Sequence, residues 1–264
     1  MAQAPHITIH AMPGSQFSAK VIVALDSRNI PHYVQFVDPR PSKRKLPSGG
    51  TMVPEMQYDG DILPESDDIL RYIDKKHNTG FFPNPQVAEA CTRASTMLAA
   101  YVFYYNWVQE EGYRRSMAAA MERYVPAFVC CFRQTAVDWL LGSTREEFKE
   151  KVAATLGLDP ENYPEDETMY EMVVKELLHY QTFLKSEQQI YLIPGTTQLT
   201  AADAALYTQV ERLVGDEGDA KLPSSLPALR SEQQLARLWK WHTILRERHP
   251  IKFKGKRPPT AGEE

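Results

Sequence analysis

The residue pattern of this chain changes once, near residue 80, and this change limits the folds that the chain can adopt. Between residues 5 and 77, short runs typical of strands alternate with runs typical of helices. Residues 78–86 then bring Gly, Pro and Asn together, which is typical of a linker. Beyond this segment strand signals almost vanish, and apolar residues recur every three or four positions. The pattern predicts a mixed α/β unit followed by an all-helical unit.

The first unit is predicted to follow a β-α-β and then a β-β-α order. The predicted elements are strands at residues 6–11, 32–37, 55–58 and 62–63 and helices over residues 17–27 and 66–76. Asp59 and Gly60 lie between the last two strands and form a favoured sequence for a tight hairpin turn.

The second unit is predicted to begin with a long helix. One face of this helix carries the apolar residues Val87, Cys91, Ala94, Leu98, Tyr101 and Tyr105. Pro126 is expected to start a new helix and Gly142 to end it, with a further helix running to Leu156. Later helices are expected over residues 169–183, 200–213 and 235–248. The predicted boundaries are residues 1–80 for the first domain, 81–86 for the linker, 87–250 for the helical domain and 251–264 for a flexible tail.

Composition and charge exclude several classes of protein. With 43% hydrophobic and 24% charged residues, the 264-residue chain is typical of globular proteins and can bury a sizeable core. Its 30 Lys and Arg residues are scattered and its net charge is −4, so no broad cationic surface for nucleic acid is expected. No apolar run reaches the length of about 18 residues that a membrane helix needs, and the N-terminus lacks the pattern of a secretory leader. We therefore expect a cytoplasmic protein without a membrane segment.

Cysteine usage agrees with that location. The three cysteines, Cys91, Cys130 and Cys131, are odd in number and include an adjacent pair. This is poor geometry for a disulfide framework and does not match the spacing of zinc ligands. Cys130 and Cys131 fall within a predicted apolar helix, where free cysteines usually act as small buried hydrophobes. The acidic residues between positions 159 and 171 are expected to form a solvated turn and helix start, so no metal site is predicted.

The first candidate for chemistry is the segment of residues 12–20, which leaves the first strand and opens the first helix. A hydroxyl at this place meets unpaired backbone N–H groups and the positive end of the helix dipole, which favour a nearby anion such as a thiolate. Ser15 is well placed to stabilise such an anion. Ser15 can equally serve only as the helix N-cap, and its position alone does not decide between the two roles.

Two further segments carry comparable signals. A cis Val53–Pro54 bond at the start of a strand would leave the Val53 backbone free to meet a ligand, and the alternative is an ordinary trans proline. Ser66 can offer its hydroxyl and backbone N–H to a carboxylate, while Glu65 can pair with an ammonium group. The alternative for this pair is a simple helix start with acids matched to the dipole.

Together, these three segments resemble the thioredoxin-fold domain of the cytosolic glutathione transferases, in which the tripeptide glutathione lies across the corresponding loops. In the second unit, residues 195–203 are similar to the buried capping box of that family, with Thr200 and Asp203 at a helix start. The resemblance covers about residues 6–250. It implies an α/β thioredoxin-like N-terminal domain followed by an all-α helical-bundle C-terminal domain.

The resemblance also implies roles for individual residues. Ser15 occupies the place of the catalytic residue, where its hydroxyl would lower the pKa of the glutathione thiol. Val53 would give main-chain contacts to the cysteinyl part of glutathione, next to a cis Pro54. Glu65 and Ser66 would hold the γ-glutamyl end. Glutathione is thus expected as a co-substrate, without a metal.

Departures from the family pattern leave some choices open. Gln16 stands where proline is common, and Ser18 stands where redox relatives have a second cysteine, so no dithiol chemistry is expected. Ser18 and Met12 remain alternatives to Ser15. The basic residues 43–45 lie close to where relatives bind the glycine carboxylate of glutathione, and a solvated loop is an equally good interpretation.

The second substrate, a small hydrophobic or aromatic electrophile, is expected to bind between the two domains. The predicted lining of this pocket is Met12, Phe17, Tyr101 and Tyr105. The competing interpretation is that Tyr101 and Tyr105, four residues apart, only pack the core.

The predicted function is therefore a glutathione transferase of the detoxifying kind, and the resemblance alone adds the expectation of a homodimer. Two alternatives remain open. One is a non-catalytic or weakly catalytic ligand-binding protein of the same fold. The other is a glutathione-dependent isomerase or lyase, which would share the tripeptide site and differ in the second pocket.

Overall fold

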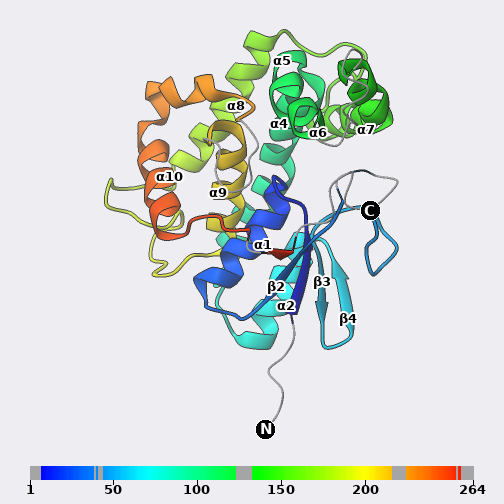
Figure 1. Ribbon diagram of the computed structural model, residues 1–264. Coiled ribbons are helices and arrows are strands. Elements are labelled where there is room, and N and C mark those ends of the chain that lie inside the picture. Colours follow the sequence, from blue (N-terminus) through cyan, green and yellow to red (C-terminus); the bar gives the residue numbers. More distant parts are fainter. Residues whose placement is uncertain are drawn as a thin grey trace.

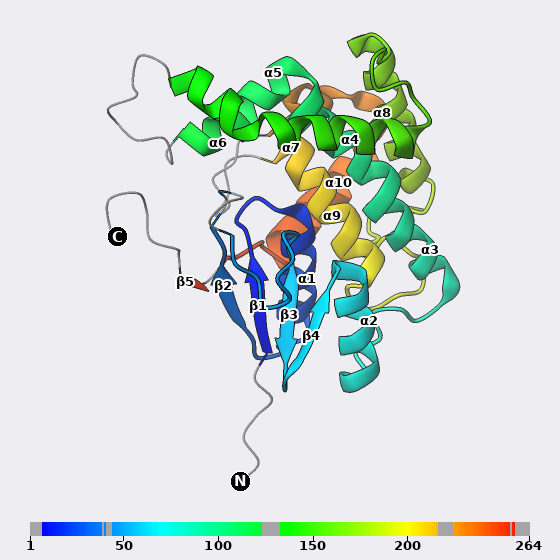
Figure 2. The ribbon, with the colours of Figure 1, turned by 90° about the vertical axis from the view of Figure 1, so that its right-hand side faces the viewer.

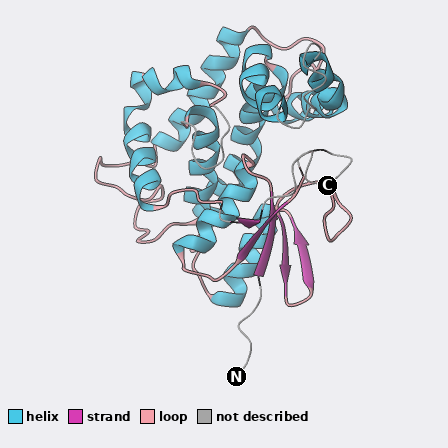
Figure 3. Ribbon diagram, viewed as in Figure 1, coloured by secondary structure: helices cyan, strands magenta, loops and turns pink. Residues whose placement is uncertain are grey.

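The computed structural model has an α/β part near the N-terminus and a helical part beyond it (Figure 1). The residues that it describes are 7–38, 40, 44–122, 133–215, 224–253, 255 and 256. The strands gather in one sheet, and helices surround it on one side (Figure 3). The predicted fold class is confirmed. The predicted helix start at Pro126, together with Cys130 and Cys131, lies outside the described residues.

The sheet has the strand order β4-β3-β1-β2-β5. Its strands are β1 (Ile7–Ala11), β2 (Tyr33–Phe36), β3 (Glu55–Tyr58), β4 (Asp61–Pro64) and β5 (Gly255–Lys256). β1 pairs in parallel with β2 and antiparallel with β3, and β3 pairs antiparallel with β4. Asp59 and Gly60 have φ angles of 50° and 97°, the positive values that a two-residue type I′ turn requires. The predicted hairpin is therefore confirmed.

Two helices, α1 (Gln16–Ser27) and α2 (Ser66–His77), cover the face of the sheet that turns toward the helical part (Figure 2). They begin at or next to their predicted first residues. The segment of α1 from Ala19 to Leu25 is buried, because α1 lies between the sheet and the central helix α9 (Ala201–Val214). The start of α1 is thus held from both sides.

The helical part begins with the predicted long helix. Its elements, including π-helical and 3-10 turns, are α3 (Pro85–Arg93), η2 (Ala94–Leu98), α4 (Ala99–Phe103), η3 (Tyr104–Val108), α5 (Glu110–Tyr113), η4 (Arg114–Ala118), α6 (Ala119–Glu122), α7 (Arg133–Leu156), α8 (Asp166–Gln181), α9, η6 (Pro227–Ser231), η7 (Gln233–Leu235) and α10 (Ala236–Arg248). The run from α3 to η3 is continuous, and all six residues of the predicted apolar face are buried. None of the described helices is long and apolar enough to cross a membrane.

The predicted end of a helix at Gly142 is wrong. Helix α7 runs through Gly142 without interruption. Its buried residues lie on both sides of the glycine, with Val137 and Leu141 before it and Val152 after it. A glycine inside a helix costs only about 1 kcal/mol relative to alanine. Burial of the flanking side chains outweighs that cost, so tertiary packing keeps the helix continuous.

Helix α9 joins the two parts of the molecule. The predicted capping box is present at its start: the Asp203 carboxylate accepts from the Thr200 N–H at 2.8 Å, and the Thr200 hydroxyl oxygen accepts from the Asp203 N–H at 3.3 Å. Arg28, which follows α1, donates to the carbonyl oxygens of Thr79 at 3.0 Å and Leu199 at 2.7 Å. The segment before α9 is therefore fastened to the α/β part.

The chain returns to the sheet near its end, where the sequence pattern indicates no strand. β5 pairs in parallel with β2 at the edge of the sheet. Just before it, the ring of Phe253 lies 6.2 Å from that of Phe36, and Ile251 packs against the same core. The backbone pairing and these apolar contacts attach residues beyond α10 to the α/β part.

Candidate functional site

The three candidate segments adjoin the sheet at the same end of its strands. The register pairs Glu55 of β3 with His10 of β1 on one side and with Pro64 of β4 on the other. The C-terminal ends of β1 and β4 and the N-terminal end of β3 therefore lie in one row. The loop to Ser15, the Val53–Pro54 bond and the residue Glu65 directly adjoin this row. We call this place the sheet-edge site; it brings together segments that lie 50 residues apart in the chain.

At the first of these segments, Ser15 caps helix α1. Its backbone is extended, and its Oγ accepts a hydrogen bond from the Ser18 N–H at 3.2 Å. A hydroxyl has two lone pairs and one proton, so this bond leaves its O–H able to donate to another group. The capping role and the catalytic role are therefore compatible in the same side chain.

Two buried polar atoms beside Ser15 lack partners. Gln16 Nε2 and Ser18 Oγ make no hydrogen bond within the described part of the chain. Most buried polar atoms in proteins are paired, and an orphaned amide donor at a helix start is suited to a polar ligand. Ser18 is fully buried, whereas Ser15 retains a small exposed fraction of 8%. Of the two serines, Ser15 is the one placed to reach a bound molecule.

The second and third segments have unusual backbone geometry. The Val53–Pro54 peptide bond is cis, as the resemblance implies. Glu65 has a φ of 65°, a left-handed value that costs free energy for a residue with a side chain and tends to occur at functional sites. Glu65 makes no side-chain cap for α2, and Ser66 is buried as the first residue of that helix. The first N–H groups of α2 thus have no side-chain acceptor from Glu65.

An ion pair between the buried Lys20 and the partly exposed Asp67 links the starts of α1 and α2, and the sequence pattern does not predict it. The Lys20 ammonium pairs with the Asp67 carboxylate and donates to Ser95 Oγ at 3.0 Å. Lys20 is only 1% exposed. The signal in the sequence was a lysine inside the otherwise apolar run of α1. Because Asp67 directly follows Ser66, this network fixes the start of α2 relative to α1.

Cys91 belongs to the same network and has no catalytic character. Its Sγ donates to Asp67 Oδ1 at 3.3 Å. Burial, more than the nearby charges, raises the pKa of the Cys91 thiol to about 12. The thiol therefore stays protonated near neutral pH and acts as a buried structural group.

The loop of residues 43–45 is partly structural. Lys43 lies outside the described residues, and Lys45 is exposed. Arg44 donates to the carbonyl oxygens of Thr51 at 2.6 Å and Asp38 at 3.3 Å. Burial lowers the pKa of the Arg44 guanidinium. Arg44 therefore holds the loop that leads to Val53.

The residues of the predicted second pocket separate into two groups. Met12 and Phe17 are partly exposed, and the Phe17 ring lies 6.0 Å from that of Phe103 on α4. Tyr101 and Tyr105 are 5% and 3% exposed and belong to the core of the helical part. Desolvation raises the pKa of both tyrosines, which keeps their hydroxyls neutral. The structure thus brings Phe17 to Phe103, while the two tyrosines pack inside.

An aromatic row continues from Phe17 into the helical part. The Phe103 ring lies 4.5 Å from that of Phe148 on α7, and Phe148 stacks on Trp107 at 4.8 Å with an angle of 19° between the ring planes. We call Phe17, Phe103, Phe148 and Trp107 the aromatic row. Phe103 and Phe148 are not among the predicted pocket residues, because no local pattern indicates that residues 45 positions apart meet.

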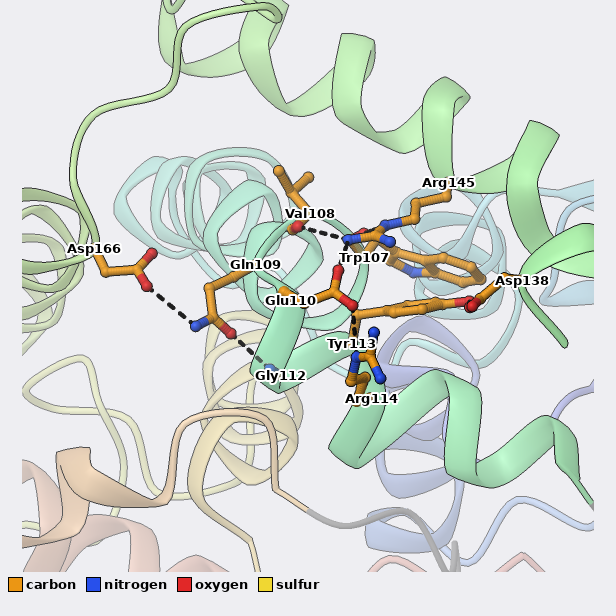
Figure 4. Close-up of polar contacts among 10 residues, drawn as sticks. All are labelled: Trp107, Val108, Gln109, Glu110, Gly112, Tyr113, Arg114, Asp138, Arg145 and Asp166. Atoms are coloured by element: carbon orange, nitrogen blue, oxygen red, sulfur yellow. Dashed lines mark hydrogen bonds and ion pairs between the residues drawn. The ribbon is translucent and has the colours of Figure 1, made fainter. Parts of the chain in front are cut away.

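Polar contacts at a break in the long helix support this row (Figure 4). The long helix ends at Val108, and Arg145 of α7 donates to the carbonyl oxygens of Trp107 at 2.8 Å and Val108 at 3.0 Å. Arg145 also pairs with Glu110 at 2.7 Å. These carbonyl groups would otherwise lack partners at a helix end. Arg145 therefore attaches α7 to the end of the long helix, and Phe148 lies against Trp107.

Comparison with known proteins agrees with this architecture. Residues 9–84 match the family model of the glutathione S-transferase N-terminal domain. This segment contains the sheet-edge site together with α1 and α2. No curated protein sequence matches the chain.

Solved structures with the same two-part fold include three proteins of low sequence identity. Glutaredoxin 2 of Salmonella typhimurium in complex with glutathione has a TM-score of 0.52 at 15% identity, over 93% of this chain and 95% of its own. Human glutathione transferase theta-2, in complex with glutathione and an unknown ligand, has a TM-score of 0.51 at 15% identity. The match covers 93% of this chain and 86% of that protein. A delta-class glutathione transferase of Nilaparvata lugens has a TM-score of 0.50 at 15% identity. The match covers 92% of this chain and 90% of that protein. At these identities the likeness shows the fold: a thioredoxin-like α/β part followed by a helical part.

Among the described residues, no three His, Cys, Asp or Glu side chains are grouped so that they could hold a metal ion. The polar groups of the sheet-edge site are instead hydroxyls, amides, backbone N–H groups and one carboxylate. Such a set suits a small zwitterionic molecule with separate anionic and cationic ends.

Proposed function

We propose that this protein belongs to the glutathione transferase superfamily and binds glutathione at the sheet-edge site. The observation that carries the proposal is the meeting of three segments in one row of the sheet, next to the starts of two helices. The matched family model and the glutathione complexes of proteins with the same fold support it.

The γ-glutamyl and cysteinyl parts of glutathione each have partners of suitable chemistry. The γ-glutamyl carboxylate would accept hydrogen bonds from the Ser66 hydroxyl and backbone N–H at the positive end of α2. The Glu65 carboxylate would pair with the γ-glutamyl ammonium. The backbone of Val53, before the cis Pro54, would pair with the cysteinyl part. The two helix starts would then hold the cysteinyl sulfur near Ser15.

Ser15 would activate the thiol by donating its O–H to the sulfur. A hydrogen bond to the charged form lowers the pKa of a thiol, and the dipole of α1 acts in the same direction. The sulfur then forms a bond to an electrophilic carbon of the second substrate. The leaving group departs with its electron pair, and the thiol proton passes to solvent. Residues 12–20 contain no cysteine, so the reacting sulfur must come from the bound tripeptide.

The remaining expectations complete the proposal. The protein would act as a cytoplasmic detoxifying homodimer, with a glutathione-binding domain over residues 1–80 and a substrate-binding domain over residues 87–250. Sedimentation of the purified protein tests the dimer: a monomeric mass at micromolar concentration would contradict it.

The central experiment measures glutathione binding and the ionisation of the bound thiol. Titration calorimetry reports binding, and the ultraviolet absorbance of the thiolate across a pH series reports the pKa. We expect a bound thiol with a pKa below that of free glutathione. Absence of binding would contradict the proposal, and binding with an unchanged thiol pKa would indicate a ligand-binding protein instead.

Substitutions of Ser15 separate its two roles. Ser15→Ala is expected to reduce kcat/KM with a generic electrophile about 100-fold, the loss typical of one donor to a developing anion. It should also destabilise the protein by about 1 kcal/mol, because α1 loses its cap. Ser15→Asp keeps a capping acceptor without an O–H donor, and Ser15→Thr keeps both. Activity should be lost in the aspartate variant and partly kept in the threonine variant; an active aspartate variant would exclude the donor role.

A further inference from the structure

A positively charged side chain, that of Lys151, lies beside one ring of the aromatic row. Lys151 of α7 places its Nζ 6.0 Å from the centre of the Phe103 ring, at the limit of a cation-π contact. The Lys151 side chain is exposed, and no carboxylate of the described residues lies within salt-bridge distance of its ammonium. The same Phe103 ring contacts Phe17, two residues after Ser15.

The neighbouring lysine of the same helix differs. Lys149 pairs with Glu146 at 3.7 Å and with Glu161 at 3.4 Å. Lys149 therefore has two carboxylate partners, whereas Lys151 has none within salt-bridge distance in the described part of the chain. Of the two lysines of helix α7, the one without a salt bridge among the described residues is therefore the one that lies at the aromatic row.

The backbone that carries Lys151 is held in place. Arg145, six residues earlier, anchors α7 to the helix break through the carbonyl oxygens of Trp107 and Val108 (Figure 4). Phe148, between Arg145 and Lys151, contacts both Phe103 and Trp107. The position of the Lys151 backbone relative to the rings of the aromatic row is therefore fixed.

We propose that the second substrate is a planar aromatic molecule that carries an oxyanion group such as a carboxylate or sulfonate; its conversion rests on the function proposed above. Its ring stacks on the partly exposed rings of Phe17 and Phe103, where a planar molecule gains dispersion and quadrupole contacts. Its anionic group pairs with Lys151, whose ammonium lacks a carboxylate partner among the described residues. Lys151 is then a specificity-determining residue.

A matched pair of substrates tests the charge preference. A chloronitrobenzoate and the chloronitrobenzamide with the same ring substitution differ only in the anionic group. In both, the glutathione sulfur bonds to the ring carbon that carries chlorine, chloride leaves with the electron pair, and the thiol proton passes to solvent. We expect the ratio of kcat/KM for the benzoate over the benzamide to fall about fivefold in Lys151→Met, the range of a partly exposed ion pair.

Lys149→Met is the control on the same helix and should leave this ratio as in the wild type. Added salt should lower the wild-type ratio, because it screens an exposed pair. A ratio that is unchanged in Lys151→Met, or that falls equally in Lys149→Met, would overturn the proposal.

A binding measurement separates this proposal from the proposed function. Anilinonaphthalene sulfonate and neutral phenylnaphthylamine report aromatic binding by fluorescence without glutathione. Lys151→Met should weaken the sulfonate about fivefold relative to the neutral probe, and Lys149→Met should not. If neither benzoate nor benzamide is converted but this selectivity is present, the transferase function fails and the site stands. Equal weakening of both probes, or of neither, shows that Lys151 does not select for charge.

Discussion

The sheet-edge site and the aromatic row are neighbours that are built in different ways. The sheet-edge site consists of loops within the first 66 residues, each next to a strand end or helix start whose geometry follows from local sequence. The aromatic row joins Phe17, Phe103 and Phe148 from three helices, and only their packing brings them together. We propose that the first region recognises polar groups through backbone geometry, whereas the second offers ring surface through tertiary contacts. Substitutions that affect one region without the other test this division.

The largest effect is expected from the ion pair between the buried Lys20 and Asp67, at the starts of α1 and α2. Lys20→Met leaves the Asp67 carboxylate without its buried partner and should lower the free energy of unfolding by about 3 kcal/mol. Urea unfolding measures this loss. The glutathione KM should rise, because Asp67 adjoins Ser66, while affinity for neutral aromatic probes should change little.

The double variant Lys20→Met with Asp67→Asn is the control for that pair. Removing the second charge should recover part of the lost stability. If Lys20→Met alone proves as stable as the wild type, the pair does not hold the starts of α1 and α2 together.

A pH effect of similar size is expected at the junction of the two parts. Burial, more than any other influence, raises the pKa of Asp203 from 3.8 to about 6, although three hydrogen bonds favour its charged form. The folded state thus binds this proton more tightly than the unfolded state. The associated stability is fully present below about pH 4 and is lost as the pH rises through about 6, a fall of about 3 kcal/mol.

Asp203→Asn tests this dependence, because it removes the titrating group. The free energy of unfolding of the wild type minus that of the variant should decrease between about pH 4 and about pH 7. A difference that stays constant over this range would show that the Asp203 pKa is not raised. The lost capping bonds contribute to the stability difference between wild type and variant at every pH. The change of this difference between two pH values therefore reports the titration of Asp203.

A smaller effect is expected from Arg145, which attaches α7 to the end of the long helix beside the aromatic row. Arg145→Met leaves two carbonyl oxygens at the helix break without their donor and should cost about 2 kcal/mol. The KM for an aromatic substrate should rise while that for glutathione stays unchanged. Arg114→Met removes only an exposed pair with Glu110 and should leave both constants as they are. Equal changes in the two KM values would contradict separate regions.

The smallest effect concerns the continuity of α7. A methyl group at Gly142 meets no atom within 4 Å, so Gly142→Ala should stabilise the protein by about 1 kcal/mol. Gly112→Ala is the contrasting control: a methyl group there would lie 2.0 Å from the Tyr105 carbonyl oxygen and should destabilise the protein. Thermal unfolding compares the two variants. Destabilisation by Gly142→Ala would indicate that α7 is interrupted there.

Local chemistry explains which elements were predictable. The hairpin at Asp59 and Gly60, the capping box at Thr200 and the start of α1 at Ser15 follow from turn geometry and hydrogen bonds within a few residues, and the start of α2 follows from acidic residues in its first turn. Ser15 illustrates the limit of such reasoning. Its pattern predicts both a cap and a catalytic hydroxyl, and the cap observed in the structure leaves the donor free for the other role.

The sequence by itself determined the two-part architecture, the order of strands and helices along the first part, and the segments proposed to hold glutathione. These depend on periodicity and on turn and capping residues, whose physical effects act over short distances. Only the tertiary structure decided that Lys20 pairs with Asp67, that α7 passes through Gly142, and that Phe103 and Phe148 form the aromatic row while Tyr101 and Tyr105 fill the core. Each of these depends on which surfaces, distant in the sequence, pack against each other and are removed from water. Helical periodicity identifies an apolar face but does not identify the surface that packs against it.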